Sequence, residues 1–145
     1  MDSIRVVRLR PEANLPTYGS KEAAGADLYA CLENDIVIQP GQSAFIPTGL
    51  AMEIPKGCAG LIYARSGLAC KRGLAPANKV GVIDSDYRGE FIVVLHNHGD
   101  QPQMVCHGER IAQLVITPVL MPGYTEVSEL TETDRSSGGF GSTGK

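Results

Sequence analysis

Residues 50–64, LAMEIPKGCAGLIYA, contain two short apolar runs separated by a Pro-Lys-Gly turn. In the first run, the apolar residues Leu50, Met52 and Ile54 stand at every second position. This two-residue period is typical of a strand with one buried face. The second run, residues 60–64, begins three residues after the last residue of the turn. The stretch therefore predicts two β-strands joined by a turn.

The same pattern of short apolar runs ended by turn residues continues along the chain. Further strands are predicted at residues 4–9, 36–38, 44–46, 91–95 and 111–119. The run at 91–95 is apolar throughout, which predicts a strand buried on both faces. One helix is predicted, residues 66–74, which Ser66 would cap and Gly73 would end. In a chain of 145 residues, this pattern indicates one all-β domain, a sandwich or a barrel.

Composition restricts the class of protein. The net charge of −3 argues against a general DNA- or RNA-binding protein, which would carry a basic surplus. No apolar run approaches the ~20 residues of a membrane helix, and the first residues lack the layout of a signal peptide. The four cysteines form no Cys-x-x-Cys pair, which predicts free thiols in a reducing compartment. We therefore expect a cytoplasmic protein with no nucleic-acid or membrane partner.

The last fifteen residues, 131–145, differ from the rest. They are rich in glycine and serine and carry almost no apolar side chain beyond Phe140. Such a segment cannot order itself by burial. Composition alone is typical of a frayed terminus, whereas Arg135 and Phe140 also fit an arm that closes over a ligand.

Two segments combine residue types that phosphate chemistry uses. Arg65 and Ser66 stand where a predicted strand meets the predicted helix, and both a helix N-terminus and an arginine can bind phosphate. Residues 78–89 have the pattern of a hairpin that carries Asp84 and Asp86 beside Tyr87. A carboxylate there could hold an attacking water or a metal-bound water. From local sequence alone, the simpler interpretations are favoured: a capping serine with a solvated arginine, and an ordinary polar turn.

Residues 108–114, GERIAQL, enter a predicted strand from a glycine turn. Strand alternation would place Arg110, Ala112 and Leu114 on one face. Ile111 and Gln113 would then lie on the other face. A glutamine among strand apolar residues needs hydrogen-bond partners if it is buried, so Gln113 would bind either a ligand or loop backbone.

Five segments, in this order, resemble the motifs of the trimeric dUTPase family. They are residues 24–29 (AGADLY), 64–68 (ARSGL), 81–89 (GVIDSDYRG), 108–114 (GERIAQL) and 135–144 (RSSGGFGSTG). The resemblance spans most of the chain and shows no departure at a key position. It implies a jelly-roll-like β-barrel subunit at 1–130, with one short helix, and a mobile arm at 131–145 that closes over the active site. It also implies a homotrimer with active sites between subunits.

The resemblance further implies hydrolysis of dUTP to dUMP and pyrophosphate, with Mg²⁺, by water attack on the α-phosphorus. That reaction keeps uracil out of DNA and supplies dUMP for dTMP synthesis. Asp84 would orient the attacking water, and Asp27 would hold waters of the Mg²⁺ ion. The substrate-binding residues implied are Arg65, Ser66, Gly67, Asn78, Gly81, Val82, Ile83, Tyr87, Gln113, Arg135, Phe140, Gly141 and Ser142.

The resemblance assigns parts of the nucleotide to different residues. Asn78 and the backbone of 78–89 would read uracil, and Tyr87 would pack beneath the deoxyribose. Arg135 would bind the γ-phosphate, and Phe140 would stack on uracil. The other phosphate contacts, direct or through water, would come from Arg65, Ser66 and Gln113.

Two other functions remain open at this point. A dCTP deaminase is a related jelly-roll enzyme, and ammonia release from dCTP would reveal it. A nucleotide-sensing trimer without enzymatic activity would bind nucleotide without turnover.

Overall fold

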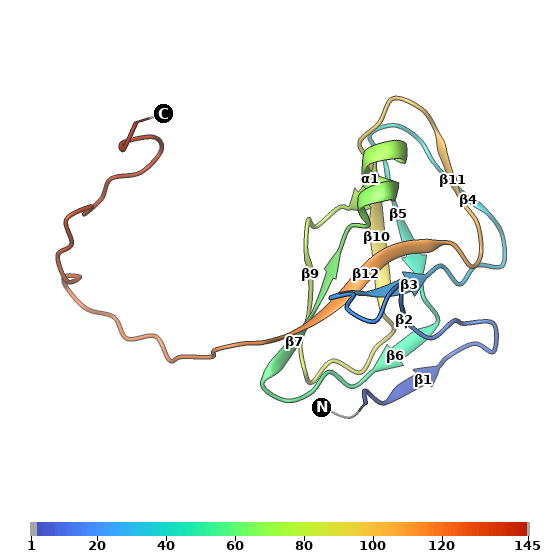
Figure 1. Ribbon diagram of the computed structural model, residues 1–145, viewed down its shortest axis with the longest axis horizontal. Helices are drawn as coiled ribbons and strands as arrows, with labels where there is room; N and C mark the ends of the chain where they lie inside the picture. Colours follow the sequence, from blue (N-terminus) through green and yellow to red (C-terminus); the bar gives the residue numbers. More distant parts are fainter. Residues whose placement is uncertain (1–2, 145) are drawn as a thin grey trace.

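The structure is a computed structural model that describes residues 3–144. Within this range it contains twelve short strands and one helix (Figure 1). The strands are β1 (Val6–Arg8), β2 (Thr17–Tyr18), β3 (Ala26–Tyr29), β4 (Ile36–Ile38), β5 (Ser43–Pro47), β6 (Leu50–Met52), β7 (Cys58–Tyr63), β8 (Leu74–Pro76), β9 (Gly81–Ile83), β10 (Ile92–Asn97), β11 (Gln103–Val105) and β12 (Arg110–Pro118). The helix α1 (Ser66–Arg72) follows β7. The prediction of a mainly β chain with one short helix is confirmed.

The strands form four sheets rather than one closed barrel. The largest has five strands in the order β2-β3-β12-β7-β9, and a second has three in the order β5-β10-β8. Two-stranded sheets are formed by β1 with β6 and by β4 with β11. Every pairing is antiparallel. The neighbouring strands β3, β12 and β7 of the large sheet position the polar residues described below.

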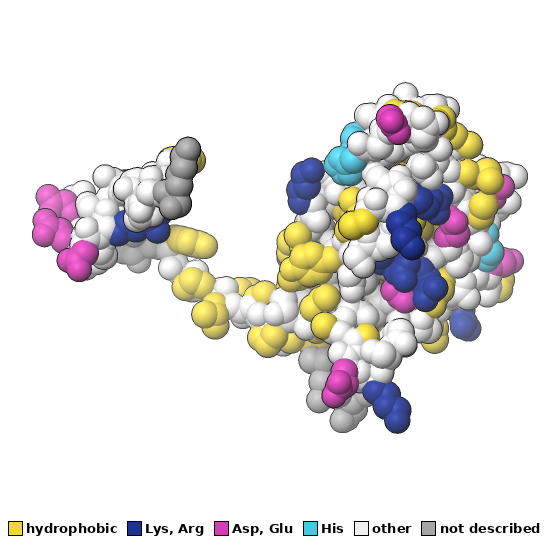
Figure 2. All heavy atoms as spheres, turned by 45° about the horizontal axis from the view of Figure 1, so that its top comes forward, with side chains coloured by type: hydrophobic (Ala, Val, Ile, Leu, Met, Phe, Trp, Pro, Cys, Tyr) yellow, Lys and Arg dark blue, Asp and Glu magenta, His cyan; other side chains and the backbone are white. Residues whose placement is uncertain are grey.

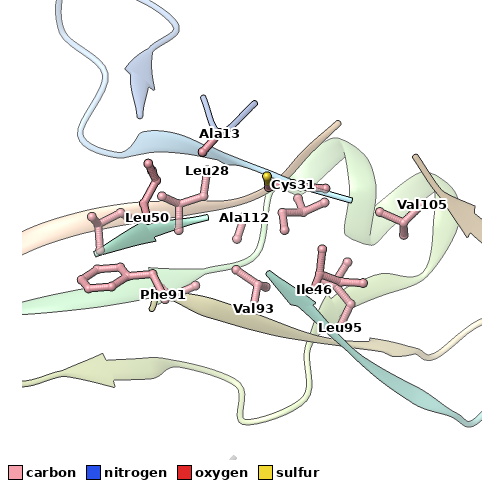
Figure 3. Close-up of a cluster of buried hydrophobic side chains, with 14 of the residues drawn as sticks. Ala13, Leu28, Cys31, Ile46, Leu50, Phe91, Val93, Leu95, Val105 and Ala112 are labelled. Carbon is pink, nitrogen blue, oxygen red and sulfur yellow. The ribbon is translucent and has the colours of Figure 1, made fainter. Parts of the chain in front are cut away.

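All four sheets contribute side chains to one core, which Figure 3 shows from Leu28 and Ala112 of the large sheet to Val93 and Leu95 of the three-stranded sheet. Phe91, just before β10, is fully buried at one side of this core. Burial of a large apolar side chain contributes about 1.5–3 kcal/mol, so this core is the main stabilising element of the subunit. The alternation predicted for residues 50–54 is confirmed, because Leu50, Met52 and Ile54 are all buried.

One strand prediction is wrong in its burial. Residues 91–95 were expected to be buried on both faces, yet they alternate: Val93 and Leu95 are buried, whereas Ile92 is 43% exposed. The reason is that Ile92 lies on the face of the three-stranded sheet that is turned away from the core. Phe45 of the neighbouring β5, 71% exposed, lies on that face too, since it pairs with Val94.

The helix begins differently from the prediction and ends as predicted. Ser66 is its first residue and does not cap it; the capping position is Arg65, whose side chain makes no cap hydrogen bond. Gly73 ends the helix in the left-handed conformation, with φ of 65°. Its N–H donates to the Ala69 carbonyl, which satisfies one of the groups that a helix end leaves free.

After β12 the chain leaves the body, and Figure 1 shows it extending far from the sheets. Residues 121–137 and 140–144 are exposed. Between residues 3 and 144 the structure has no helix with the length and apolar surface that crossing a membrane requires. All four cysteines are free thiols, as predicted.

Candidate active site

A nearly buried carboxylate lies on β3, beside the central strand β12 of the large sheet. Asp27 of β3 is 12% exposed in its side chain and accepts a hydrogen bond at Oδ1 from Arg65 Nε, at 2.8 Å. Arg110 Nη1 lies 3.7 Å from the other oxygen, Oδ2. Two guanidinium groups compensate the cost of taking this carboxylate out of water. The sequence analysis assigns Arg110 no role, although it stands in the segment 108–114; the contact with Asp27 appears only in the folded chain.

Gln113 of β12 joins this group through the backbone. It is in register with Asp27 on one side and with Tyr63 on the other. Its Nε2 donates to the Ala64 carbonyl at 2.8 Å, just before Arg65. A side chain at Gly25 would collide with the Gln113 amide oxygen, so glycine is needed there. Gln113 thus satisfies loop backbone in this structure, and its amide oxygen remains as an acceptor.

The predicted alternation along residues 110–114 holds from Ala112 to Leu114 and is wrong before Ala112. The register of β12 against β3 shifts between Arg110 and Ala112, so both Ile111 and Ala112 are buried. A bulge of this kind puts one extra residue in the strand and turns the preceding side chain to the other face.

The start of α1 lies directly beyond this cluster. Ser66 and Gly67 are exposed, and a Cβ at Gly67 would meet no atom within 4 Å. The first N–H groups of a helix have no partner within the helix and favour anionic ligands. Arg65, Ser66 and Gly67 therefore line an open, positively polarised end of β7.

The segment 78–89 is not the paired hairpin that the sequence indicated. β8 pairs with β10, whereas β9 pairs with β7, so the two strands flanking Asn78 belong to different sheets. β9 is the edge strand of the large sheet, and one row of its backbone groups therefore has no partner in the sheet. A small cavity of about 80 Å³ opens between β9 and β10, lined by Ile62, Pro76, Asn78, Gly81, Val82, Ile83, Ile92, Val93 and Val94.

Glycine at position 81 keeps this cavity narrow but open. Gly81 is buried, and a Cβ there would lie 3.2 Å from Ile62 Cβ and 3.4 Å from Asn78 Nδ2. A larger residue would therefore push against both walls. The free backbone groups of β9 and the Asn78 amide are together suited to form hydrogen bonds with the polar edge of a flat ring.

Asp84 follows β9 and is exposed. Among residues 3–144 no ion pair involves Asp84, so its carboxylate is free to accept a proton or hold a water. Tyr87 closes the next turn through its N–H to the Asp84 carbonyl, at 3.2 Å. The Tyr87 ring is 42% exposed and lies 6.1 Å from the Phe91 ring.

The structure does not bring Asp84 near Arg65 within one chain. Ile83 is opposite Gly60 on β7, so Asp84 lies beside Ala59, whereas Arg65 lies beyond the other end of the strand. Those six positions of extended chain span roughly 20 Å. The residues predicted to bind phosphate and the residue predicted to orient water are thus two separate groups.

The predicted residues of the arm form a third group. Arg135 donates from Nε to the Gly138 carbonyl at 2.7 Å, a contact within the arm itself. Phe140 is fully exposed and has a positive φ of 50°. Gly141 and Ser142 are also exposed, and Figure 2 shows this part of the chain well away from the body.

The residues around Asp27 fit a magnesium ion held through water. Both Asp27 oxygens already face arginines, so a divalent cation bound directly there would lie beside two positive charges. Within residues 3–144 no three acidic, histidine or cysteine side chains are arranged to hold a metal. Mg²⁺ commonly keeps several waters and is held by one or two carboxylates together with substrate phosphates. Asp27 is suited to that shared arrangement.

Comparisons with known proteins identify relatives over nearly the whole chain. The dUTPase family model matches residues 11–144. A deoxyuridine 5'-triphosphate nucleotidohydrolase of Syntrophotalea carbinolica is 50% identical over 142 residues, which cover 98% of this chain and 97% of that protein. Another, of Desulfitobacterium hafniense, is 51% identical over 149 residues and 99% of each chain.

Solved structures show the same fold. The Staphylococcus bacteriophage 80alpha dUTPase with dUPNHPP superposes with a TM-score of 0.86 and 28% identity, over 100% of both chains. A mutant dUTPase of phage phi11 of S. aureus, described with a coordinated structural Mg(II) ion, has a TM-score of 0.81 and 25% identity, over 90% of this chain and 100% of that one. Because the family model covers nearly the whole chain, this protein belongs to the dUTPase family.

Proposed function

We propose that this protein hydrolyses dUTP to dUMP and pyrophosphate by water attack on the α-phosphorus. The observation that carries the proposal is the family match over residues 11–144, which includes both the Asp27 cluster and the 78–89 segment. Such an activity keeps uracil out of DNA and supplies dUMP for dTMP synthesis. The free thiols of all four cysteines support a cytoplasmic location.

Phosphoryl transfer depends on positioning and charge neutralisation more than on covalent help. Arg65 is held at a fixed angle by Asp27, so its remaining N–H groups are oriented before the substrate arrives. Ser66, Gly67 and Gln113 add neutral hydrogen-bonding groups beside it. A bound Mg²⁺ ion, whose waters Asp27 would hold, would neutralise charge on the phosphates.

Uracil recognition is assigned to the cavity between β9 and β10. The base presents an acceptor, a donor and an acceptor along its pairing edge. We assign the complementary pattern to Asn78 and to the backbone groups that Gly81, Val82 and Ile83 leave free at the edge of β9, which the lining of the cavity supports. Cytosine has an amino donor where uracil has O4, so a fixed N–H would face another donor, and unpaired buried polar groups reject strongly.

Thymine and ribose require rejection by shape instead. A methyl group is worth only about 1–3 kcal/mol by lost contact, so a close and rigid wall is needed against thymine. The narrow cavity at Gly81 supports this role. Tyr87 is assigned to the deoxyribose, where its ring would leave no room for a 2′-hydroxyl.

We assign orientation of the attacking water to Asp84, and we propose that the complete site forms only in a homotrimer. The separation of Asp84 from Arg65 by the length of β7 supports a site that takes its groups from different subunits, with Arg135, Phe140, Gly141 and Ser142 delivered by an arm. Mixed trimers of Asp84→Asn and Arg65→Ala subunits should then regain part of the activity that each variant lacks alone. Failure of every mixture to recover activity would contradict a shared site.

The substrate assay is pyrophosphate release from dUTP, dCTP, dTTP and UTP, with and without a chelator of divalent metal. We expect release from dUTP alone, and much slower release after chelation. Comparable rates on dUTP and UTP would contradict the assignment of Tyr87, and undiminished turnover in excess chelator would contradict the role of Mg²⁺. Ammonia release from dCTP would indicate a deaminase instead.

A further inference from the structure

A charged pair outside the five motifs holds the end of the 78–89 segment. Arg10 Nη1 and Nη2 donate to Glu90 Oε1 and Oε2 at 3.1 and 2.9 Å, a two-point contact between residues eighty positions apart. The Gly49 N–H also approaches Oε2, at 3.3 Å. The side chains are 37% and 20% exposed, so water screens this pair less than a fully exposed one. We call these two residues the Arg10–Glu90 brace.

The Tyr87 side chain is hydrogen-bonded to the main chain of Glu90. Its hydroxyl donates to the Glu90 carbonyl at 2.8 Å. The ring folds back over Gly89, because a Cβ there would lie only 2.7 Å from Tyr87 Cζ. The orientation of the ring therefore depends on where the Glu90 main chain lies.

Glu90 belongs to no strand. It lies between the turn at 85–86 and β10, which begins at Ile92. The nearest anchors follow it: the Phe91 N–H donates to the Leu50 carbonyl at 2.8 Å, and Thr48 Oγ1 donates to the Phe91 carbonyl at 2.6 Å. The Phe91 N–H belongs to the same planar peptide as the Glu90 carbonyl, so its bond to Leu50 holds that carbonyl, while the Glu90 carboxylate ties the chain on the Tyr87 side to the body.

We infer that Arg10 and Glu90 are positioning residues for Tyr87 and so contribute to discrimination between dUTP and UTP. This inference rests on the proposed function, in which the Tyr87 ring packs beneath the deoxyribose. Without the brace, the chain from Tyr87 to Glu90 can shift against the anchored Phe91 peptide, so the ring loses its fixed position and space opens for a 2′-hydroxyl. The Arg10 guanidinium also holds the pKa of the Glu90 carboxyl below its usual value, so the pair stays charged at neutral pH.

The test is a double-mutant cycle with Glu90→Gln, Tyr87→Phe and the combination. For each protein, kcat/KM is measured on dUTP and on UTP, and the ratio gives the sugar selectivity. We expect Glu90→Gln to lower this selectivity at least about tenfold, as expected for the loss of one packing contact. If Glu90 acts through the tyrosine hydroxyl, adding Glu90→Gln to Tyr87→Phe should change selectivity little further.

Two further variants separate positioning from general stability. Arg10→Lys keeps the charge but not the two-point contact, so its selectivity should fall between wild type and Glu90→Gln. The matched control is Glu53→Gln, which breaks the exposed Arg5–Glu53 pair of 3.3 Å and should leave selectivity unchanged. Should Glu90→Gln fail to fold, Arg10→Lys carries the test.

The outcomes distinguish this inference from the proposed function. A wild-type protein that releases no pyrophosphate from dUTP overturns both. Wild-type turnover of dUTP with unchanged selectivity in Glu90→Gln and Arg10→Lys overturns the inference alone, even if both variants melt earlier. Fully additive effects of Glu90→Gln and Tyr87→Phe would show that the brace acts on the fold and not through Tyr87.

Discussion

Asp84 is the residue on which the proposed hydrolysis depends. Replacing it with Asn keeps the size of the side chain and removes the charge that polarises the attacking water. Turnover of dUTP should fall at least ~10²-fold, the lower end for general-base help. Substrate binding should survive, because the phosphate and uracil contacts lie elsewhere. Steady-state kinetics together with titration of a non-hydrolysable dUTP analogue would separate the two effects.

The control is Asp86, the other acid of the same turn. Asp86 is also exposed, and no ion pair in the described part of the chain involves it. Asp86→Asn should therefore leave turnover near the wild-type value. Loss of turnover in Asp86→Asn, with Asp84→Asn nearly unaffected, would reverse the assignment.

At the scale of elements, the end of α1 requires glycine for two reasons: the backbone conformation and the packing around it. Gly73 needs a positive φ, and a Cβ there would lie 2.8 Å from the Gly99 backbone nitrogen. Backbone cannot rotate aside as a side chain can. Gly73→Ala should therefore cost more than the roughly 1–2 kcal/mol of left-handed strain alone.

Gly41 provides the matched control for this prediction. It has a similar φ of 75°, but a Cβ there would meet no atom within 4 Å. Thermal unfolding should show a larger decrease in Tm for Gly73→Ala than for Gly41→Ala. Equal decreases would mean that the contact between the helix end and Gly99 adds nothing to stability.

The elements also show what sequence alone can and cannot determine. Strand positions such as 36–38, and the helix end at Gly73, follow from local rules: alternation, turn residues and the need for φ > 0. The exposed face of β10, the bulge before Ala112 and the separate pairings of β8 and β9 depend on contacts between distant segments. No local pattern encodes those contacts, so the predictions failed there.

The candidate site likewise contains some residues that the sequence identifies and others that it does not. The resemblance named Asp27, Arg65 and Gln113, and the structure brings them together. Arg10 and Glu90 were not found, because they are eighty positions apart and Arg10 stands in no motif. A pair of opposite charges becomes visible as a brace only when the fold places one beside the other.

At the scale of the whole molecule, the chain after β12 contacts little of its own body. Leu120, Met121, Tyr124 and Leu130 are each at least 77% exposed. Figure 2 shows such apolar side chains following one another along the segment that leaves the body. This exposure is unfavourable in an isolated subunit and supports the proposal that the subunits assemble.

The arm that follows should be dispensable for folding and necessary for turnover. Ordering each residue costs ~1–2 kcal/mol of backbone entropy, and only ligand contacts by Arg135 and Phe140 can offset that cost. Deleting residues 136–145 should leave Tm nearly unchanged and dUMP binding intact, while turnover collapses because the closed, water-excluding state is lost. The chain contains no tryptophan, so Phe140→Trp adds a single fluorescent reporter. Its emission should change with a non-hydrolysable dUTP analogue and hardly with dUMP, which lacks the outer phosphates. Full-rate hydrolysis by the truncated protein would show that the arm is only a frayed terminus.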